Sequence, residues 1–181
     1  MRRYLHYETA FEDYLRTRGI PYVPVDETRK VIFSGIRIKS FDFLVYPAEN
    51  CHWIVDVKGR KFPYGKKGSR SGGGYWENWV TREDVDGLSE WQEVFGPDFE
   101  ARFVFAYLLS GTPDHWPPGR PHCWRGQFYA FFTVSISEYI RHCRQRSARW
   151  DTVTVPRQVF RTIAKPLANY CSRCYDFTAS A

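Results

Sequence analysis

Two strand-like segments within residues 38–60 constrain the fold most, because each carries charged residues inside an otherwise apolar run. The first holds Asp42, and the second holds Asp56 and Lys58. Side chains two positions apart on a strand share a face, so Asp56 and Lys58 are expected to project together. Residues 47–50 between the segments are typical of a short turn, which predicts two adjacent strands.

A carboxylate or ammonium inside an apolar strand is costly unless it pairs, binds a metal or takes part in chemistry. One interpretation is a structural ion pair between Asp56 and Lys58. The other is a functional site, in which carboxylates on adjacent strands hold a hard divalent cation on oxygen ligands. A lysine one step further along the strand then supplies a point charge beside a phosphate.

Composition limits the class of protein. The chain has 181 residues, with 43% hydrophobic and 25% charged residues, which fits a single globular domain over residues 1–181. The net charge of +6 permits an acidic polymer as partner. No apolar run is long enough to span a membrane, and the N-terminus does not have the pattern of a signal peptide. Five cysteines, an odd number, favour reduced thiols and a cytoplasmic location.

Hydrophobic periodicity predicts an order of helix, three strands, helix and strand in the first part of the chain. The ranges expected for these elements are a helix over 3–18, strands around 21–25, 42 and 53–58, a helix over 84–95, and a buried strand over 101–109. A Pro-rich connection over 111–126 follows. Beyond it we expect a strand over 127–134, a helix capped by Ser137 and extending to about 145, a short strand over 152–155, and a last helix broken by Pro166.

Two further features bear on the predicted site. Glu8 falls on the apolar side of the first helix, where it either lies at the edge of the apolar stripe or points toward the core. The segment after Lys58 is rich in glycine and is expected to be a basic loop, which either is solvated or follows a phosphate backbone. Its basic residues are Arg60, Lys61, Lys66, Lys67 and Arg70.

The pair Cys171 and Cys174 has the spacing of a metal or redox site, but no second CxxC pair accompanies it. Completing a zinc site would require ligands from the unlinked segments at 122–123 and 142–143. We therefore favour structural or inert thiols.

Glu8 on a first helix, Asp42, and then Asp56-Val57-Lys58 form a pattern that resembles the PD-(D/E)XK nuclease superfamily, which includes archaeal Holliday-junction resolvases and restriction enzymes. The resemblance spans about residues 1–110, with 111–181 as a C-terminal extension of a strand and helices packed on this core. The segment His6–Glu12 (HYETAFE) also resembles the signature of the bacterial HYExAFE family. Phe41 stands where the superfamily motif has its proline.

The resemblance implies an α/β fold with a central mixed β-sheet flanked by helices, a restriction endonuclease-like core in the order α-β-β-β-α-β. It also implies a nuclease that hydrolyses phosphodiester bonds in nucleic acid, with DNA as the favoured substrate. Asp42, Asp56 and the Val57 carbonyl would bind Mg²⁺ or Mn²⁺, with Glu8 completing the ligand set. Lys58 would position the attacking water, and the arginines within 141–149, together with the basic loop, would contact the substrate backbone. Many members dimerise, so a homodimer is compatible with the pattern.

Two other classes of function remain open from the sequence. One is a nucleic-acid-binding module that keeps the fold without cutting. The other is a protein-interaction domain in which the charged residues form only a buried ion network. Retention of all four polar residues favours the nuclease, because a binding module has no need for three carboxylates that repel phosphates.

Overall fold

The computed structural model describes residues 5–25, 32–33, 36–37, 39–62 and 76–170. Its helices are α1 (Leu5–Thr17), α2 (Arg82–Phe95), α3 (Ile136–His142) and α4 (Arg157–Ile163), with 3-10 turns at Pro113–His115 and Leu167–Tyr170. The strands are β1 (Tyr22–Pro24), β2 (Ile32–Phe33), β3 (Ile36–Arg37), β4 (Phe43–Ala48), β5 (Cys51–Phe62), β6 (Val80–Thr81), β7 (Phe99–Leu109), β8 (His122–Trp124), β9 (Gln127–Ser135), β10 (Arg144–Ser147), β11 (Thr152–Thr154) and β12 (Lys165–Pro166).

The central sheet has the strand order β1-β4-β5-β7-β9-β12, and β8 pairs with the first residues of β9, Gln127 to Tyr129. Strands β5 and β7 run parallel, from the pair His52 and Phe99 to the pair Phe62 and Leu109. All the other pairs of this sheet are antiparallel. Helix α2 connects β5 to β7, as a parallel pair requires a crossover. The predicted mixed sheet flanked by helices is therefore confirmed.

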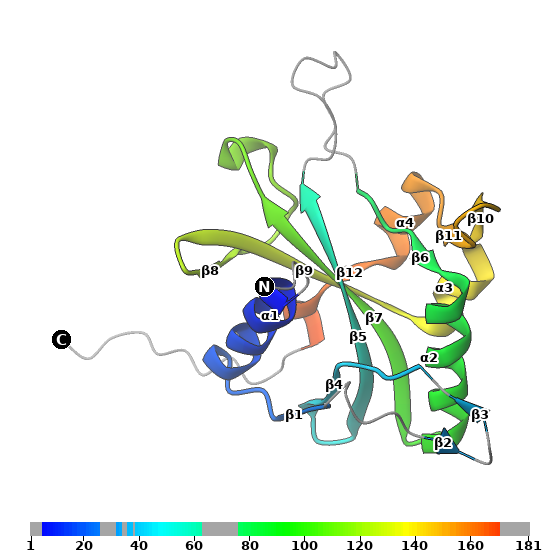
Figure 1. Cartoon of the computed structure of the whole chain (residues 1–181). Coiled ribbons are helices and arrows are strands. Elements are labelled where there is room, and N and C mark those ends of the chain that lie inside the picture. The colour runs from blue at the N-terminus through cyan, green and yellow to red at the C-terminus, as the bar shows by residue number, and fades with distance from the viewer. Residues whose placement is uncertain (1–4, 26–31, 34–35, 38, 63–75, 171–181) are drawn as a thin grey trace.

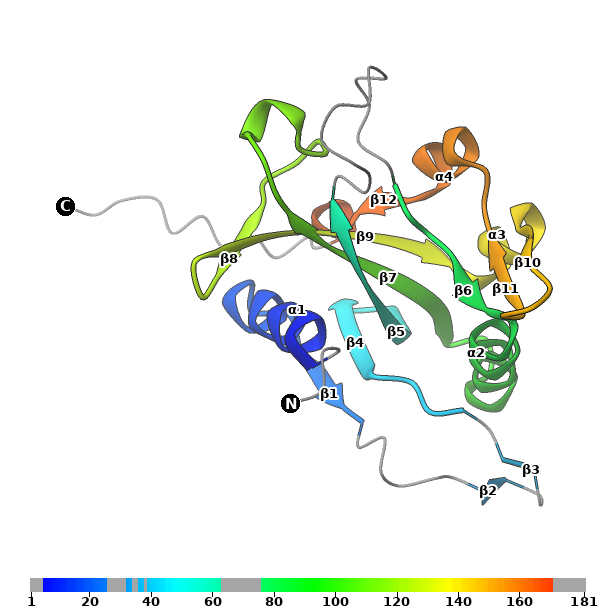
Figure 2. The ribbon, with the colours of Figure 1, turned by 45° about the horizontal axis from the view of Figure 1, so that its top comes forward.

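Helices cover both faces of this sheet (Figure 1). Helix α1 packs on one face, where Phe11 and Leu15 join Val55 and Val57 of β5 in one buried cluster. Helices α2, α3 and α4 lie on the other side, as the turned view in Figure 2 also shows. Side chains alternate along β5, so Asp56 and Lys58 face α2 while Val55 and Val57 face α1.

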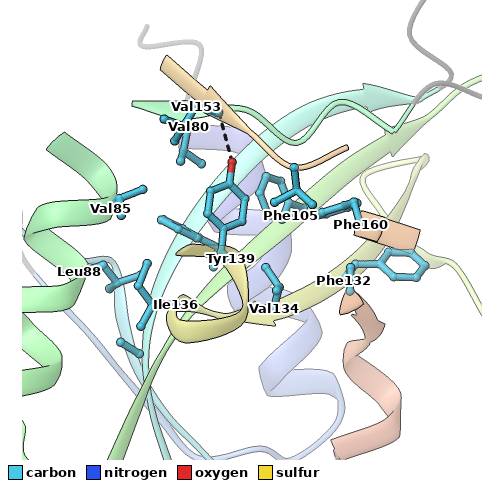
Figure 3. Packing of buried hydrophobic residues seen from close by; sticks show 14 of the residues in the cluster. Val80, Val85, Leu88, Phe105, Phe132, Val134, Ile136, Tyr139, Val153 and Phe160 are labelled. Atoms are coloured by element: carbon cyan, nitrogen blue, oxygen red, sulfur yellow. Dashed lines mark hydrogen bonds between the residues drawn. The ribbon is translucent and has the colours of Figure 1, made fainter. Parts of the chain in front are cut away.

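A small second sheet of order β10-β11-β6 packs against the core on the α2 side of the central sheet (Figure 3). Tyr139 of α3 is fully buried, and its hydroxyl donates to the Val153 carbonyl of β11 at 3.2 Å and to the Asn78 carbonyl at 2.7 Å. Val80 and Val153 are buried against it. Since β6 leads directly into α2, the small sheet is joined firmly to the start of that helix.

Several expected boundaries are corrected by the structure. Strand β5 continues to Phe62, so Arg60 and Lys61 belong to a strand rather than to a loop. The pairing of β5 with β7 along this whole length accounts for the extension. Strand β4 includes Pro47 and Ala48, which shortens the turn to residues 49 and 50. Lys66, Lys67 and Arg70 lie outside the described residues, as do Cys171 and Cys174.

The C-terminal part differs in similar ways. Ser135, not Ser137, caps α3, with its hydroxyl accepting from the Glu138 amide. The helix ends at His142, because the arginines that follow enter strand β10 and pair with β11. Helix α4 ends at Ile163, before Pro166, which lies in β12 and pairs with β9.

Candidate functional site

The centre of the candidate site is an ion pair on β5. Lys58 Nζ lies 2.7 Å from Asp56 Oδ2, as expected for side chains two apart on one face of a strand. Asp56 is only 7% exposed, and the Lys58 ammonium lies 5.9 Å from the centre of the Phe103 ring. The pair is therefore buried between β5, β7 and α2.

A second carboxylate, Asp84 of α2, completes this pair. Asp84 Oδ1 lies 3.0 Å from Lys58 Nζ and also accepts from Lys39 Nζ. Its other oxygen, Oδ2, accepts the Thr81 amide at 2.8 Å, while the Thr81 hydroxyl accepts the Asp84 amide at 3.0 Å. This capping box fixes the start of α2 and aims the Asp84 carboxylate at β5.

Asp84 was not predicted as a site residue, but its position at the start of a helix has a signal in the sequence. Thr81 stands three residues before Asp84, at the start of an apolar helical pattern, which is the spacing of a capping box. That spacing predicts the cap and the burial of the carboxylate near the helix start. It does not predict the lysines, because their approach depends on the packing of α2 against β5.

The four residues Lys39, Asp56, Lys58 and Asp84 form a cluster of two buried acids, the largely buried Lys58 and the exposed Lys39, called here the charged cluster. Burial alone would raise the pKa of Asp84, but Lys58, Lys39 and the Thr81 amide outweigh it and hold this pKa well below its ordinary value. Burial likewise lowers the pKa of Lys58, and Asp56 and Asp84 more than reverse this effect. For Asp56, burial dominates and raises the pKa, assisted by the nearby Asp84.

Asp42 was predicted within a strand, but it lies in the bend directly before β4, and its carboxylate is turned toward β5. Asp42 Oδ2 accepts the Val57 amide at 2.5 Å, and the Asp42 amide donates to the Val55 carbonyl at 2.9 Å. Phe43 pairs with Val55 in an antiparallel ladder, so Asp42, just before Phe43, and Asp56, just after Val55, lie at the same end of that ladder. The Asp42 side chain is buried.

Glu8 lies in the first turn of α1, on the opposite face of the sheet from α2, and is half-buried. The preceding residue, Tyr7, lies directly on Gly59 of β5, where an added Cβ would come within 2.1 Å of the Tyr7 ring. Gly59 follows Lys58 in the strand. This close approach fixes how α1 lies against β5. The contact is made by the neighbours in sequence of Glu8 and Lys58.

The donor set suits a hard divalent cation better than a soft one. Two carboxylates, Asp42 and Asp56, and the main-chain carbonyl of Val57 are all oxygen ligands, which Mg²⁺ and Mn²⁺ prefer. Within the described residues, no group of three or more His, Cys, Asp or Glu side chains is arranged to hold a metal ion. Glu8 is therefore not brought into such a group with Asp42 and Asp56.

The predicted basic contacts divide into buried and exposed residues. Arg60 is 9% exposed; its guanidinium stacks on Trp79 at 4.3 Å and donates to the carbonyls of Gly59 and Trp79. Lys61, the next residue, is exposed. Of the arginines between 141 and 149, Arg146 lies on Trp79 at 5.1 Å, and all four side chains (Arg141, Arg144, Arg146 and Arg149) are exposed.

The histidine considered for a zinc site at 122 has another partner. His122 Nε2 lies 2.8 Å from Asp13 Oδ2 of α1, so this contact joins β8 to the helix.

Cys51, Cys123 and Cys143 are free thiols. No helix in the described part of the chain is long and apolar enough to cross a membrane.

No protein-family model matches the chain, and no curated protein matches it in sequence, so membership of the HYExAFE family remains a prediction. Among solved structures, the chain is similar to Hjc of Archaeoglobus fulgidus, a Holliday junction resolvase from an archaeal hyperthermophile. The similarity covers 95% of this chain and 98% of the resolvase, with a TM-score of 0.54 and 12% sequence identity. At this identity the likeness shows the fold alone, a restriction endonuclease-like α/β fold with a central mixed sheet flanked by helices.

Proposed function

We propose that the chain is a metal-dependent nuclease that hydrolyses phosphodiester bonds, with DNA as its substrate. One observation carries the proposal: Asp42 is hydrogen-bonded to the Val57 amide, directly beside Asp56 and one residue from Lys58, in a fold shared with a resolvase. Two carboxylates and a lysine crowded into an apolar sheet are costly to fold. A catalytic role explains why this chain has them together.

In this proposal Asp42, Asp56 and the Val57 carbonyl hold Mg²⁺ or Mn²⁺, and Glu8, on the α1 side of the sheet, lies outside this ligand set. A divalent ion bound there would lower the pKa of a bound water and stabilise charge on the phosphate. The hydrogen bond from the Val57 amide orients the Asp42 carboxylate toward the Asp56 segment. Burial of Asp56 excludes water from its surroundings and strengthens its interaction with any cation.

Lys58 has the role of a fixed cation rather than a base. Its pKa is raised because Asp56 and Asp84 outweigh the effect of burial, so its amine carries a proton at neutral pH. A protonated lysine cannot accept a proton from water, but it can orient that water and offset the phosphate charge. Asp84 is a positioning residue, because it holds the Lys58 ammonium from the side of α2.

The test combines metal binding with cleavage. Isothermal titration of Mg²⁺ and Mn²⁺ into the wild type and Asp56→Asn is run beside a panel of labelled junction, flap, single-stranded and duplex DNA. Metal-dependent cleavage that Asp56→Asn abolishes supports the proposal. The control is Asp98→Asn, at an exposed carboxylate in the connection from α2 to β7, which should bind and cleave as the wild type does.

A second candidate is a nucleic-acid-binding module on the same fold that does not cut. It is favoured by the charged cluster, in which Lys58 already contacts two carboxylates and Asp84 contacts two lysines. Such a cluster can hold β5 and α2 together without a metal. DNA binding with strong salt dependence, no metal binding and no cleavage would establish this function instead.

A further inference from the structure

Trp150 is the most exposed large hydrophobic side chain in the described part of the chain, at 67%. It lies in the turn between β10 and β11, where the Arg149 guanidinium covers its ring at 5.1 Å. A tryptophan exposes a large apolar surface to water at a cost in free energy. A single exposed ring is common on protein surfaces, but this ring lies in a firmly anchored turn and among basic side chains.

The turn is anchored from both sides. Asp151 has a φ of 41°, an uncommon conformation for a residue other than glycine, and the Trp150 amide donates to the Ser147 hydroxyl at 3.4 Å. The Arg82 amide donates to the Asp151 carbonyl at 2.9 Å, and Arg82 Nε lies 3.3 Å from Asp151 Oδ1. The residue next to Trp150 is thus tied to the first residue of α2.

This anchor connects the turn to the candidate site. Arg82 stands two residues before Asp84, whose carboxylate contacts Lys58. Strand β11 is held against β6 by the pair Val153 and Val80, and its buried side is fixed by the Tyr139 hydroxyl (Figure 3). The hairpin and the start of α2, which carries Asp84 of the charged cluster, therefore belong to one packed unit.

The surroundings of Trp150 are basic. Arg144, Arg146 and Arg149 of the hairpin all have exposed side chains, and Arg146 also lies 3.8 Å from Glu77 Oε1. Arg146 also stacks on Trp79 at 5.1 Å, on a ring that Arg60 contacts at 4.3 Å. Arginine side chains interleaved with aromatic rings are typical of surfaces that bind single-stranded nucleic acid, in which arginines contact phosphates and rings stack on bases.

We propose that the tip of the β10–β11 hairpin binds unpaired nucleic acid, with one unstacked base resting on the Trp150 ring and the neighbouring arginines contacting the flanking phosphates. This inference rests on the proposed function, and it selects a substrate class for it: single strands, flaps and junctions with an unpaired base. In an intact duplex each base face is already covered by its neighbours, so the Trp150 ring gains little from it. The ring would therefore favour unpaired DNA over duplex.

The test measures binding without cleavage. Fluorescence anisotropy in EDTA compares a labelled mixed-sequence single strand with the same strand annealed to its complement. Trp150→Ala should weaken single-strand binding by about tenfold or more and leave duplex binding nearly unchanged. Trp150→Phe, which keeps a ring, should retain most of the affinity. Arg149→Ala should instead reduce the salt dependence of binding to both substrates.

Trp124 provides a matched control, because Arg125 covers its ring at 4.8 Å in the β8–β9 turn. This turn lies at the opposite end of the molecule from β10 (Figures 1 and 2). Trp124→Ala should keep the preference for single strands. Trp124 is partly buried, so thermal melting is measured for this variant and for the Trp150 variants alike.

The outcomes separate this inference from the nuclease proposal. Selective loss of single-strand affinity in Trp150→Ala supports the inference even if the wild type never cleaves. Cleavage by the wild type with an unchanged substrate preference in Trp150→Ala overturns the inference and leaves the nuclease. An equal loss for single strand and duplex, or no binding of either by the wild type, also overturns it.

Discussion

The ammonium of Lys58 lies 3.0 Å from Asp84 Oδ1, and this ion pair joins the middle of β5 to the first turn of α2. Two regions that are far apart in the sequence are thereby fixed at the candidate site. Because Asp84 also forms the capping box with Thr81, one carboxylate both starts the helix and holds the lysine. The charged cluster thus has a structural role that can be measured apart from any catalysis.

Replacing Asp84 with alanine should destabilise the fold strongly. The change removes the capping box and leaves the largely buried Lys58 and the exposed Lys39 with one carboxylate fewer. Losses of this kind are expected to lower the free energy of unfolding by about 2–5 kcal/mol. Denaturant unfolding measures it, and Asp86→Ala, at an exposed aspartate of the same helix, should stay within about 0.5 kcal/mol of the wild type. If Asp84→Ala and Asp86→Ala lowered the free energy of unfolding by similarly small amounts, Asp84 would not have the structural role described.

The pH dependence of that stabilisation follows from the lowered pKa of Asp84. Burial would raise this pKa, but the two lysines and the Thr81 amide hold it below the ordinary value of 3.8. A depressed pKa contributes stability above the unfolded-state value and loses it as the pH falls toward the folded-state value. The difference in unfolding free energy between wild type and Asp84→Asn should be constant from about pH 7 to about pH 5 and shrink below about pH 4. A difference that grows with acid would disprove the assignment.

Arg60 should matter for stability, and Lys61 should not. The Arg60 side chain is buried, stacks on Trp79 and donates to two main-chain carbonyls, while its neighbour Lys61 is exposed. Arg60→Ala is expected to cost about 2–3 kcal/mol through lost packing and unsatisfied carbonyls. Lys61→Ala should change the free energy of unfolding by less than about 0.5 kcal/mol. Equal effects in denaturant unfolding would show that Arg60 is not held as described.

The main helices and long strands, and the placement of Asp56 and Lys58 on one face of a strand, were predicted from the sequence, because both follow from local periodicity. The short strands β2, β3, β6, β8, β10 and β12 were not predicted. The capping residue of α3 and the length of β5 were not predicted. Strand length is set by partners: β5 extends to Phe62 because β7 pairs with it to Leu109. Periodicity within one segment contains no information about where a distant partner strand ends.

The same reason explains what was missed at the site. The sequence indicates that Asp84 starts a helix, but only the packing of α2 on β5 brings it to Lys58. Arg60 was assigned to a basic loop because glycines and lysines follow it, whereas its burial depends on Trp79 from another segment. Charged residues are the hardest to place from sequence, since the same side chain is exposed or buried according to a partner far along the chain.

Gly59 is a second point at which the site depends on close packing. An added Cβ would lie 2.1 Å from the Tyr7 ring, so Gly59→Ala must displace α1 or turn that ring. Overpacking of this kind is expected to cost about 1–3 kcal/mol. Combining it with Tyr7→Ala should cost less than the sum of the two single changes, because the double variant no longer has the clash. Additive losses in a double-mutant cycle would mean that Tyr7 does not set the position of α1.

Asp42 allows the structural role of the site to be separated from its proposed catalytic role. Its Oδ2 accepts the Val57 amide at 2.5 Å, and an asparagine oxygen can accept the same hydrogen bond. Asp42→Asn should therefore fold with a free energy of unfolding within about 1 kcal/mol of the wild type, whereas Asp42→Ala leaves the buried amide unpaired and should lose about 1–3 kcal/mol. The neutral amide is a much weaker ligand for Mg²⁺ than a carboxylate, so both variants should lose metal binding and cleavage. A stable Asp42→Asn protein that still binds Mg²⁺ would show that Asp42 serves only the strand, and the metal site would then have to be sought elsewhere.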